Sequence, residues 1–229
     1  MPGMSGAAPK RLALTAAERI ALALYSLAWI LATPLAMAYL AWRARRQPEY
    51  RRHWRERWAW WRDGAPSAAQ AAARPLWIHA VSVGETRAAQ PLIEALLARD
   101  AQLTILLTHM TPTGRATGEE LFARRWPLRV HQQYLPYDHA WAIRRFLARW
   151  RPRLGVIMET ELWPNVCAAA AHAGVPLALV NARLSERSLH KGLRWRALIG
   201  PALRSLAAVL AQTDADALRL RRLGRADAP

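Results

Sequence analysis

From about residue 75 onward, the chain alternates short apolar runs with longer segments of helical patterning. The apolar runs occupy residues 76–81, 103–107, 130–135, 154–157, 177–180 and 207–210. The helical segments occupy residues 86–99, 115–125, 140–150, 164–173, 193–206 and 214–223. Short apolar runs bounded by turn residues are typical of strands buried in a parallel sheet. We therefore predict an α/β fold, a doubly wound Rossmann-like parallel sheet with helices on both faces.

A longer apolar run precedes this region. Residues 20–42 contain 23 residues and no formal charge. As a helix this run would be ~34 Å long, enough to cross a bilayer core of ~30 Å, and Pro34 would kink it without preventing it. A cleaved signal peptide is disfavoured because the run is too long for one. We predict a membrane-anchor helix, with a monotopic helix in the membrane plane as the close alternative and a buried globular helix as a third reading.

The segment after this run is strongly basic. Residues 43–57 carry seven arginines against two glutamates, so the positive-inside rule places the chain beyond Trp42 in the cytoplasm. Aromatic side chains recur there at helical spacing, at Tyr50, Trp54, Trp58 and Trp61. This predicts an amphipathic helix at the headgroup layer with its arginines on anionic membrane lipids. The expected organisation is a polar tail (1–19), an anchor helix (20–42), a basic aromatic helix with a linker (43–74) and a Rossmann-like domain (75–229).

The length, net charge and cysteine content of the chain limit the classes of function that it can have. With 229 residues, 53% of them hydrophobic, the chain is not disordered as a whole. Its formal net charge of +17 favours an anionic partner, either nucleic acid, acidic lipid or a phosphorylated substrate, although biased codon usage offers a simpler reading. No nucleic-acid motif is present and the charge is densest beside the apolar run, so we expect no nucleic-acid partner. The single cysteine, Cys167, permits no intrachain disulfide.

Polar side chains directly follow each predicted strand. They stand at residues 82–86, 108–114, 136–138, 159–165, 181–188 and 212–214. Ligands of parallel sheets bind beyond the carboxyl ends of the strands, so these groups suit a sugar or a phosphate. The sequence has no P-loop, no G-x-G-x-x-G loop, no nucleophile elbow and no HExxH or paired-cysteine spacing. We expect no protein-bound metal or cofactor.

Five motifs in order carry a resemblance to a known family. AVSVGET, THMTPTG, YLPYD, METELWPN and NARLSERS closely resemble the N-terminal half of the 3-deoxy-D-manno-octulosonic acid (Kdo) transferases. The resemblance implies a membrane-associated glycosyltransferase of the two-Rossmann-domain (GT-B) type that acts in lipopolysaccharide biosynthesis. Such enzymes transfer Kdo from CMP-Kdo to a phosphorylated glucosamine disaccharide, a lipid A precursor, at the cytoplasmic face of the inner membrane and without a protein-bound metal.

The resemblance also assigns candidate residues. Glu85 matches the general base of the family's S-V-G-E motif, and a carboxylate in reach of an attacking hydroxyl can take its proton. A first-turn carboxylate that only favours the helix dipole is the alternative. Glu159 or Glu161 is expected to bind sugar hydroxyls or orient loops, and Arg183 and Arg187 are either phosphate clamps or solvated loop residues. The other substrate-binding candidates are Gly84 and three hydroxyl residues that can equally cap helices, Ser82, Thr111 and Thr113.

The family's second Rossmann domain, which carries the nucleotide site, has no counterpart before Pro229. We therefore expect an acceptor half that is active only together with a donor domain. The alternative is a membrane-anchored acceptor-binding protein without catalytic activity. The stretch His190-Lys191-Gly192 also replaces an aromatic-containing stretch expected of the family.

Overall fold

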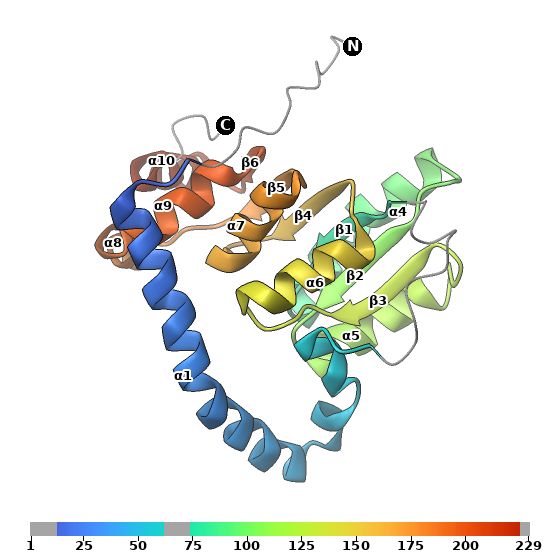
Figure 1. The fold of residues 1–229 in the computed structure, drawn as a ribbon. Coiled ribbons are helices and arrows are strands. Elements are labelled where there is room, and N and C mark those ends of the chain that lie inside the picture. Colours follow the sequence, from blue (N-terminus) through green and yellow to red (C-terminus); the bar gives the residue numbers. More distant parts are fainter. Residues whose placement is uncertain (1–12, 62–73, 225–229) are drawn as a thin grey trace.

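The structure, a computed structural model, describes residues 13–61 and 74–224. Most of the expected polar tail and most of the linker expected before residue 75 lie outside these ranges. The described residues form a parallel sheet with helices on both faces, preceded by one long helix that runs along the side of the domain (Figure 1).

Six parallel strands form the sheet, in the order β3-β2-β1-β4-β5-β6. Their bounds are β1 Leu76–His79, β2 Ile105–His109, β3 Val130–Tyr134, β4 Leu154–Met158, β5 Leu177–Ala182 and β6 Ala208–Ala211. Each coincides with an apolar run of the sequence, which confirms the predicted doubly wound sheet. The chain reverses its direction of winding between β1 and β4, and the crevice at such a switch point is where ligands of open parallel sheets bind.

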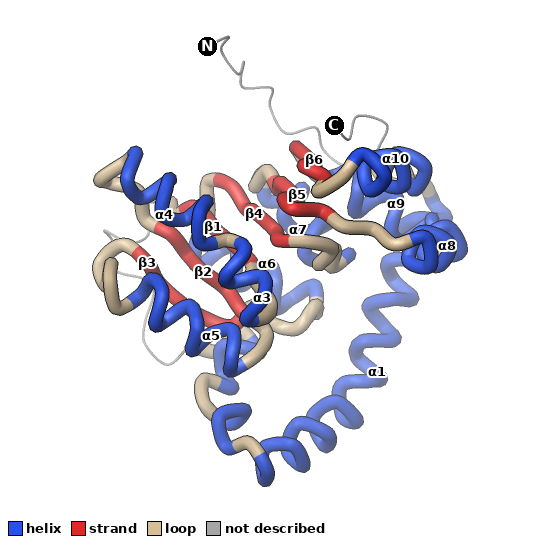
Figure 2. Tube along the Cα trace, turned by 180° about the vertical axis from the view of Figure 1, so that it is seen from behind, coloured by secondary structure: helices blue, strands red, loops and turns tan. Residues whose placement is uncertain are grey.

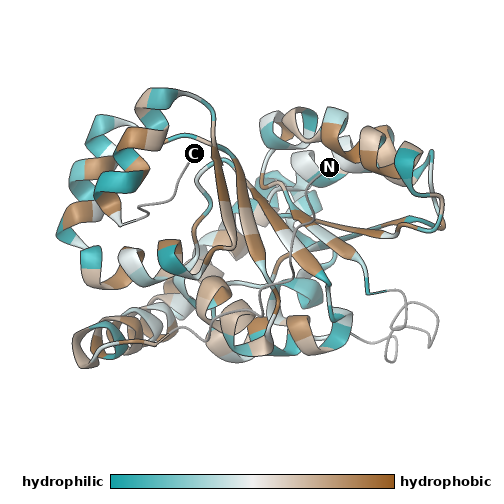
Figure 3. Cartoon of the chain, turned by 90° about the horizontal axis from the view of Figure 1, so that it is seen from above, coloured by the Kyte–Doolittle hydropathy of each residue, from teal (hydrophilic) through white to brown (hydrophobic). Residues whose placement is uncertain are grey.

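Successive strand residues point to opposite faces of the sheet, and the core is divided accordingly. Trp77 belongs to a buried cluster with Phe146 and Val166, whereas its neighbour Ile78 belongs to a second cluster with Ile93. The first cluster lies under α6 Ala140–Trp150 and α7 Pro164–Ala173, on the face seen in Figure 1. Figure 2 shows the opposite face, covered by α3, α4 and α5. Hydrophobic strands therefore fill the middle layer between two layers of helices (Figure 3).

Several helices begin earlier than the sequence pattern predicts. The helix expected from residue 86 is divided into α3 Val83–Ala88 and α4 Gln90–Arg99, and the helix expected from residue 115 begins with α5 Pro112–Gly118 and continues as a π-helical turn, η3 Glu119–Ala123. After β5 the chain forms α8 Glu186–Arg194 and α9 Arg196–Ser205, and α10 Asp214–Leu223 follows β6. The reason is capping: a hydroxyl residue after the strand accepts a hydrogen bond from a backbone N–H of the first turn, at Ser82, Thr111 and Ser185. The last helix, α10, begins at residue 214 as predicted.

The apolar run predicted to be a membrane anchor forms a continuous helix, α1 Ala16–Arg46. It is long and apolar enough to cross a membrane. Thr15 caps its N-terminus in a reciprocal capping box with Glu18. Pro34 lies inside the helix, which is bowed along its length without being interrupted (Figure 1).

The face of α1 that contacts the domain carries its polar side chains. Tyr25 Oη donates a hydrogen bond of 2.9 Å to Asp138, and Thr33 Oγ1 lies 3.0 Å from Nε2 of His139. The opposite face is apolar and exposed, with Leu31 69% and Leu35 76% accessible. A soluble surface helix has the reverse arrangement. The pattern therefore indicates that α1 is attached to the domain by polar contacts and by packing of Trp29 on Trp163, and that its exposed apolar side faces something other than water.

Asp138 connects this helix to the sheet domain. Its carboxylate accepts hydrogen bonds from Tyr25 Oη and from the backbone N–H groups of Asn165 and Val166, in the first turn of α7. Asn165 also accepts a hydrogen bond of 3.1 Å from Ser26 of α1. Burial raises the pKa of Asp138 to about 6, although the three donors oppose that shift.

The basic aromatic segment does not form the single amphipathic helix expected of it. Two short 3₁₀ helices, η1 Pro48–Arg51 and η2 Trp54–Trp58, take its place. Left-handed backbone conformations at His53 (φ 54°) and Ala59 (φ 52°) interrupt the chain at these points. The aromatic side chains explain the difference, because Trp58 is buried against His139 of the domain and does not face outward.

We predict that Asp138→Asn lowers the free energy of unfolding by about 1–3 kcal/mol. The amide group of asparagine would place N–H donors against the O–H and N–H groups that donate hydrogen bonds to the Asp138 carboxylate. Urea unfolding of the full chain in detergent micelles, followed by circular dichroism, measures this. Asp100→Asn is the matched control, since that exposed carboxylate accepts only a local hydrogen bond from Gln102. Equal losses in the two variants would contradict the role of Asp138.

The raised pKa adds a pH signature. The folded protein holds the Asp138 proton more tightly than the unfolded chain does, whose carboxyl has a pKa near 3.8. This contribution to stability is therefore complete below about pH 4 and is lost as the pH rises through about 6. Asp138→Asn is expected to reduce the slope of stability against pH in this window, and an unchanged slope would contradict the raised pKa.

Candidate active site

Glu85 lies in the first turn of α3, immediately beyond the carboxyl end of β1. Its side chain is 7% exposed. One carboxylate oxygen accepts a hydrogen bond of 2.8 Å from the backbone N–H of Val81, and the other accepts one of 3.0 Å from the hydroxyl of Ser82. Both oxygens are thus fixed by the turn that precedes the helix, and each retains capacity for a further donor.

The environment of Glu85 favours its protonated form. Burial raises the pKa of its carboxyl, the hydrogen bonds from Val81 and Ser82 lower it, and the negative charges of Glu161 and Glu159 raise it further. Burial and then the charge of Glu159 also raise the pKa of Glu161, and a hydrogen bond from Trp163 opposes this shift. The fold therefore brings three predicted site carboxylates, from the ends of β1 and β4, close enough to interact electrostatically.

The turn after β2 is hydrogen-bonded to the turn that holds Glu85. The carbonyl of Val81 accepts hydrogen bonds from the backbone N–H of Thr111 (3.2 Å) and from its hydroxyl (3.1 Å). Gly114 makes this approach possible, because a Cβ there would lie 2.9 Å from the Val81 carbonyl oxygen. Thr113 is exposed beside this contact. The two turns therefore form one unit at the rim of the sheet.

The hydroxyl candidates Ser82 and Thr111 both act as helix caps. Ser82 Oγ accepts from the N–H of Glu85, and Thr111 Oγ1 accepts from the N–H of Gly114. Gly84 is different, because a Cβ at this position would meet nothing nearer than Ser82 Oγ at 3.9 Å. Packing within the chain therefore does not require glycine there, and the space above the first turn of α3 is open.

Two buried histidines lie beneath these turns and help to hold them in place. Nothing in the sequence pattern had singled out either histidine. His109 Nδ1 lies 2.9 Å from the carbonyl of Ala80, and His79 Nδ1 lies 2.9 Å from the hydroxyl of Thr108. Burial lowers the pKa of His109 to about 3 and that of His79 to about 4, so both are neutral at physiological pH. His109 belongs to the THMTPTG motif, so the sequence did contain a signal for this residue. The motif alone does not show that His109 contacts the turn before Glu85.

Backbone strain marks the ends of the next two strands. Glu159, after β4, has φ 57°, and Asn181, near the end of β5, has φ 56°. Left-handed conformations of residues other than glycine cost free energy and are frequent at functional sites. The N–H of Glu159 still donates to the carbonyl of Val180, so this conformation is fixed by the sheet edge.

The arginine candidates lie elsewhere. Arg183 follows β5 and Arg187 lies in the first turn of α8, two strands along the sheet from β1. Both are exposed, and no contact within the described ranges connects them to Glu85. The structure therefore unites Ser82, Gly84, Glu85, Thr111 and Thr113 with the two β4 glutamates, but leaves the arginine pair apart.

Within residues 13–61 and 74–224, no group of three or more His, Cys, Asp or Glu side chains could hold a metal ion. The chemistry available at this rim is that of a fixed carboxylate of raised pKa next to hydroxyl and carboxylate groups. Such a group can take a proton from a hydroxyl that is placed against it.

Comparison with known proteins assigns the family. The family model described as 3-deoxy-D-manno-octulosonic-acid transferase (kdotransferase) matches residues 52–228. The chain belongs to the Kdo transferase family. The match covers the N-terminal half of that family's fold, as the five motifs predicted.

Individual relatives agree with this assignment. The chain is 54% identical over 164 residues to the 3-deoxy-D-manno-octulosonic acid transferase of Bordetella pertussis, over 71% of this chain and 38% of that relative. It is 31% identical over 200 residues to the enzyme of the same name from Haemophilus influenzae, over 87% of this chain and 45% of the relative. For the Rickettsia felis protein the identity is 34%, over 71% of this chain and 34% of the relative. The matched part thus spans less than half the length of these relatives.

We predict that Glu161→Gln lowers the pKa of the Glu85 carboxyl, because it removes a negative charge that opposes its ionisation. The measurement is a ¹³C NMR titration of the glutamate side chains in the full chain. Glu120→Gln removes an exposed carboxylate from the same domain and serves as the control. A pKa of Glu85 that does not respond to Glu161→Gln, or responds equally to both changes, would contradict the coupling.

Proposed function

We propose that this member of the Kdo transferase family binds the acceptor for the transfer of Kdo from CMP-Kdo to a lipid A precursor, and that Glu85 is the general base. The observation that carries the proposal is the position of Glu85. It is a nearly buried carboxylate of raised pKa, held by Val81 and Ser82 at the strand end where the sheet reverses its winding. Ligand-binding crevices of such sheets lie at this place.

The chemistry follows from that carboxylate. As the acceptor hydroxyl oxygen forms a bond to the anomeric carbon of Kdo, the bond from that carbon to the CMP phosphate oxygen breaks and CMP leaves with the electron pair. The hydroxyl proton moves to Glu85. A pKa raised by burial makes the carboxylate a stronger base toward the hydroxyl proton. The hydrogen bonds from Val81 and Ser82 fix its orientation.

The neighbouring candidates then have distinct roles. Glu159 and Glu161 tune the pKa of Glu85 and accept hydrogen bonds from sugar hydroxyls. Ser82 fixes the carboxylate of Glu85 and Thr111 holds the two turns together. Gly84 leaves room for the sugar, and Thr113 offers an exposed hydroxyl. Arg183 and Arg187, on the far side of β4, remain candidates for contacts with a phosphate or with the nucleotide-sugar half of the enzyme.

The location we propose is the cytoplasmic face of the inner membrane, with α1 lying in the membrane plane. Its contacts with the domain extend from Glu18, which pairs with Arg204, to Thr33, which meets His139. These residues are ~22 Å apart along a helix. If α1 crossed the bilayer, the part of the domain that contacts it between Glu18 and Thr33 would have to enter the hydrocarbon layer as well. The free-energy cost of burying those polar and charged groups in lipid would be too high. An in-plane helix places only its apolar outer face in lipid, with Arg46 of its last turn on anionic headgroups.

A second candidate function is an acceptor-binding protein without catalytic activity. One observation favours it: both oxygens of Glu85 are already engaged within its own turn, as a purely structural cap would be. Measurement of turnover separates the two functions.

The test uses a chimera that joins this chain to the remainder of the Bordetella pertussis relative. We expect Glu85→Gln to lower the rate of Kdo transfer by about 10²- to 10⁴-fold, because glutamine keeps the shape of the side chain but cannot take a proton. Glu120→Gln is the control, and binding of the acceptor is measured in parallel. Turnover by Glu85→Gln at the unsubstituted rate would refute the base, and an inactive unsubstituted chimera that still binds acceptor would favour the non-catalytic function.

The orientation of α1 has its own test. Single cysteines carrying a fluorophore at positions 24, 31 and 35 should all be quenched from one shallow depth, ~5–10 Å below the headgroups, because these residues share the exposed face. A label at position 26, on the face that meets Asn165, is the control and should be quenched less. Cys167 is buried and need not be replaced. A label depth that first increases toward the bilayer centre and then decreases along the helix would show that α1 spans the membrane.

A further inference from the structure

A polar hollow lies between the end of α1 and the turn after β2. Its volume is about 460 Å³, and its walls come from the last turn of α1, from η1 and from α5. The side chains that line it include Arg43, Arg52, His53, Thr113, Arg115 and Glu119. Of the predicted site residues, Thr111 and Thr113 line the hollow, whereas the predicted base and the predicted arginine clamps do not, so the hollow adjoins the candidate site.

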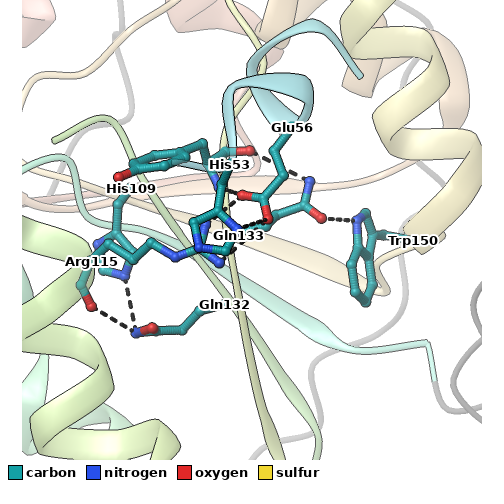
Figure 4. Close-up of polar contacts among 8 residues, drawn as sticks. His53, Glu56, His109, Arg115, Gln132, Gln133 and Trp150 are labelled. Carbon is teal, nitrogen blue, oxygen red and sulfur yellow. Dashed lines mark hydrogen bonds and ion pairs between the residues drawn. The ribbon is translucent and has the colours of Figure 1, made fainter. Parts of the chain in front are cut away.

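One wall of the hollow is a rigid, internally neutral unit. Arg115 of α5 forms a two-point ion pair with Glu56 of η2 (Figure 4), and both side chains are 17% exposed. Glu56 also accepts a hydrogen bond of 2.8 Å from the backbone N–H of Tyr134 at the end of β3. His53 lies 3.4 Å from the same carboxylate, and burial followed by the charge of Arg115 lowers the pKa of this imidazole. The charge of Arg115 is thus balanced within the wall.

The two other arginines, Arg43 and Arg52, do not belong to this ion-paired unit. Among the described residues, neither Arg43 nor Arg52 forms an ion pair with a carboxylate. Arg43 is held over the ring of Tyr50, 4.6 Å from its centroid, and donates hydrogen bonds to the neutral side chains of Gln47 and Tyr39. This positions the guanidinium group and leaves its remaining N–H groups available. Two guanidinium groups suit a phosphate monoester, which accepts paired N–H donors and carries up to two negative charges.

Other lining groups suit a sugar. Glu49 and Glu119 provide carboxylates that accept from hydroxyl groups, and Thr113 provides a hydroxyl. A mixture of cationic, carboxylate and hydroxyl groups is poorly suited to a bare anion, which the carboxylates would repel. It is well suited to a phosphate attached to a hydroxyl-rich ring.

The position of the hollow connects the membrane-facing helix to the candidate base. On one side, the last turn of α1 follows the exposed aromatic residues Tyr39 and Trp42, which are typical of the headgroup layer. On the other side, the turn at Thr111 is bonded to Val81, whose N–H holds Glu85. A ligand whose acyl chains stay in the bilayer would bring its polar head past this hollow on the way to Glu85.

We propose that this hollow binds a phosphate monoester on the sugar head of a lipid-anchored acceptor, with Arg43 and Arg52 as the phosphate ligands. The proposal rests on the proposed function and adds to it the place where the phosphate is held. It locates that phosphate on the β2–β3 side of Glu85, opposite to the side of Arg183 and Arg187.

The test measures binding to the full chain in detergent micelles. The probes are a lipid-linked glucosamine disaccharide that carries phosphate monoesters and the same compound after enzymatic removal of the phosphates. We expect the double variant Arg43→Ala/Arg52→Ala to bind the phosphorylated probe at least about tenfold more weakly, the effect of losing one or more charge-assisted hydrogen bonds, and to bind the dephosphorylated probe unchanged. Inorganic phosphate should compete only weakly, because it lacks the sugar.

Two matched double variants serve as controls. Arg45→Ala/Arg51→Ala removes the same charge from exposed positions of the same segment that do not line the hollow. Arg183→Ala/Arg187→Ala tests the alternative phosphate site. A tenfold loss of affinity for the phosphorylated probe in Arg45→Ala/Arg51→Ala would show that the effect is a general attraction between charges. A loss of affinity confined to Arg183→Ala/Arg187→Ala would place the phosphate on the other side of Glu85. Either result overturns the proposal.

A further variant guards against unfolding. Arg43→Lys/Arg52→Lys keeps both charges but not the paired N–H donors, so it should bind the phosphorylated probe more tightly than Arg43→Ala/Arg52→Ala does. Thermal unfolding of each variant is recorded. Equal weakening of both probes by Arg43→Ala/Arg52→Ala would overturn the phosphate site. Tight binding of the phosphorylated probe by that variant would do the same and leave the proposed function intact, since the latter depends on turnover by the chimera and on Glu85.

Discussion

The carboxylate of Asp138 is the interaction on which the arrangement of the molecule depends. It accepts hydrogen bonds from the first turn of α7, which lies over the sheet, and from Tyr25 of α1. The same group therefore completes the backbone hydrogen bonding of a core helix and holds the long N-terminal helix in place. Since these contacts occupy the polar side of α1, its apolar side must face outward. The position of the apolar surface thus follows from the polar contacts of the opposite face, in which Asp138 is joined by Asn165 and His139.

A second constraint operates at the rim of the sheet. The N–H of Val81 donates to the carboxylate of Glu85, and the carbonyl of Val81 accepts from Thr111 in the neighbouring turn. A substitution that displaced one turn would therefore displace the other, so the position of the candidate base is coupled to the wall of the polar hollow. Buried, neutral His109 supports both from below through the carbonyl of Ala80. Pre-organisation of this kind holds a carboxylate in place without help from a substrate.

The sequence was sufficient for the sheet and for most of the rim, because both depend on local patterns. Apolar runs predicted all six strands, and the polar residues after them predicted which side chains would lie at one rim of the sheet. The role of Glu85 as general base came from the family resemblance and stays a proposal. It was insufficient where a side chain's partner is distant along the chain. The spacing of Trp54, Trp58 and Trp61 predicted one helix, but burial of Trp58 against His139 gave two short ones. In the same way, nothing local indicates that Glu56 pairs with Arg115 or that Asp138 holds α1.

The outward apolar face of α1 has a consequence for the membrane itself. In the in-plane placement proposed above, α1 is tied to a polar domain along one side and occupies a single leaflet. Its volume expands that leaflet relative to the opposite one and creates a preference for convex, loosely packed lipid. The proposed anchor thereby links where the protein settles to the local shape of the bilayer.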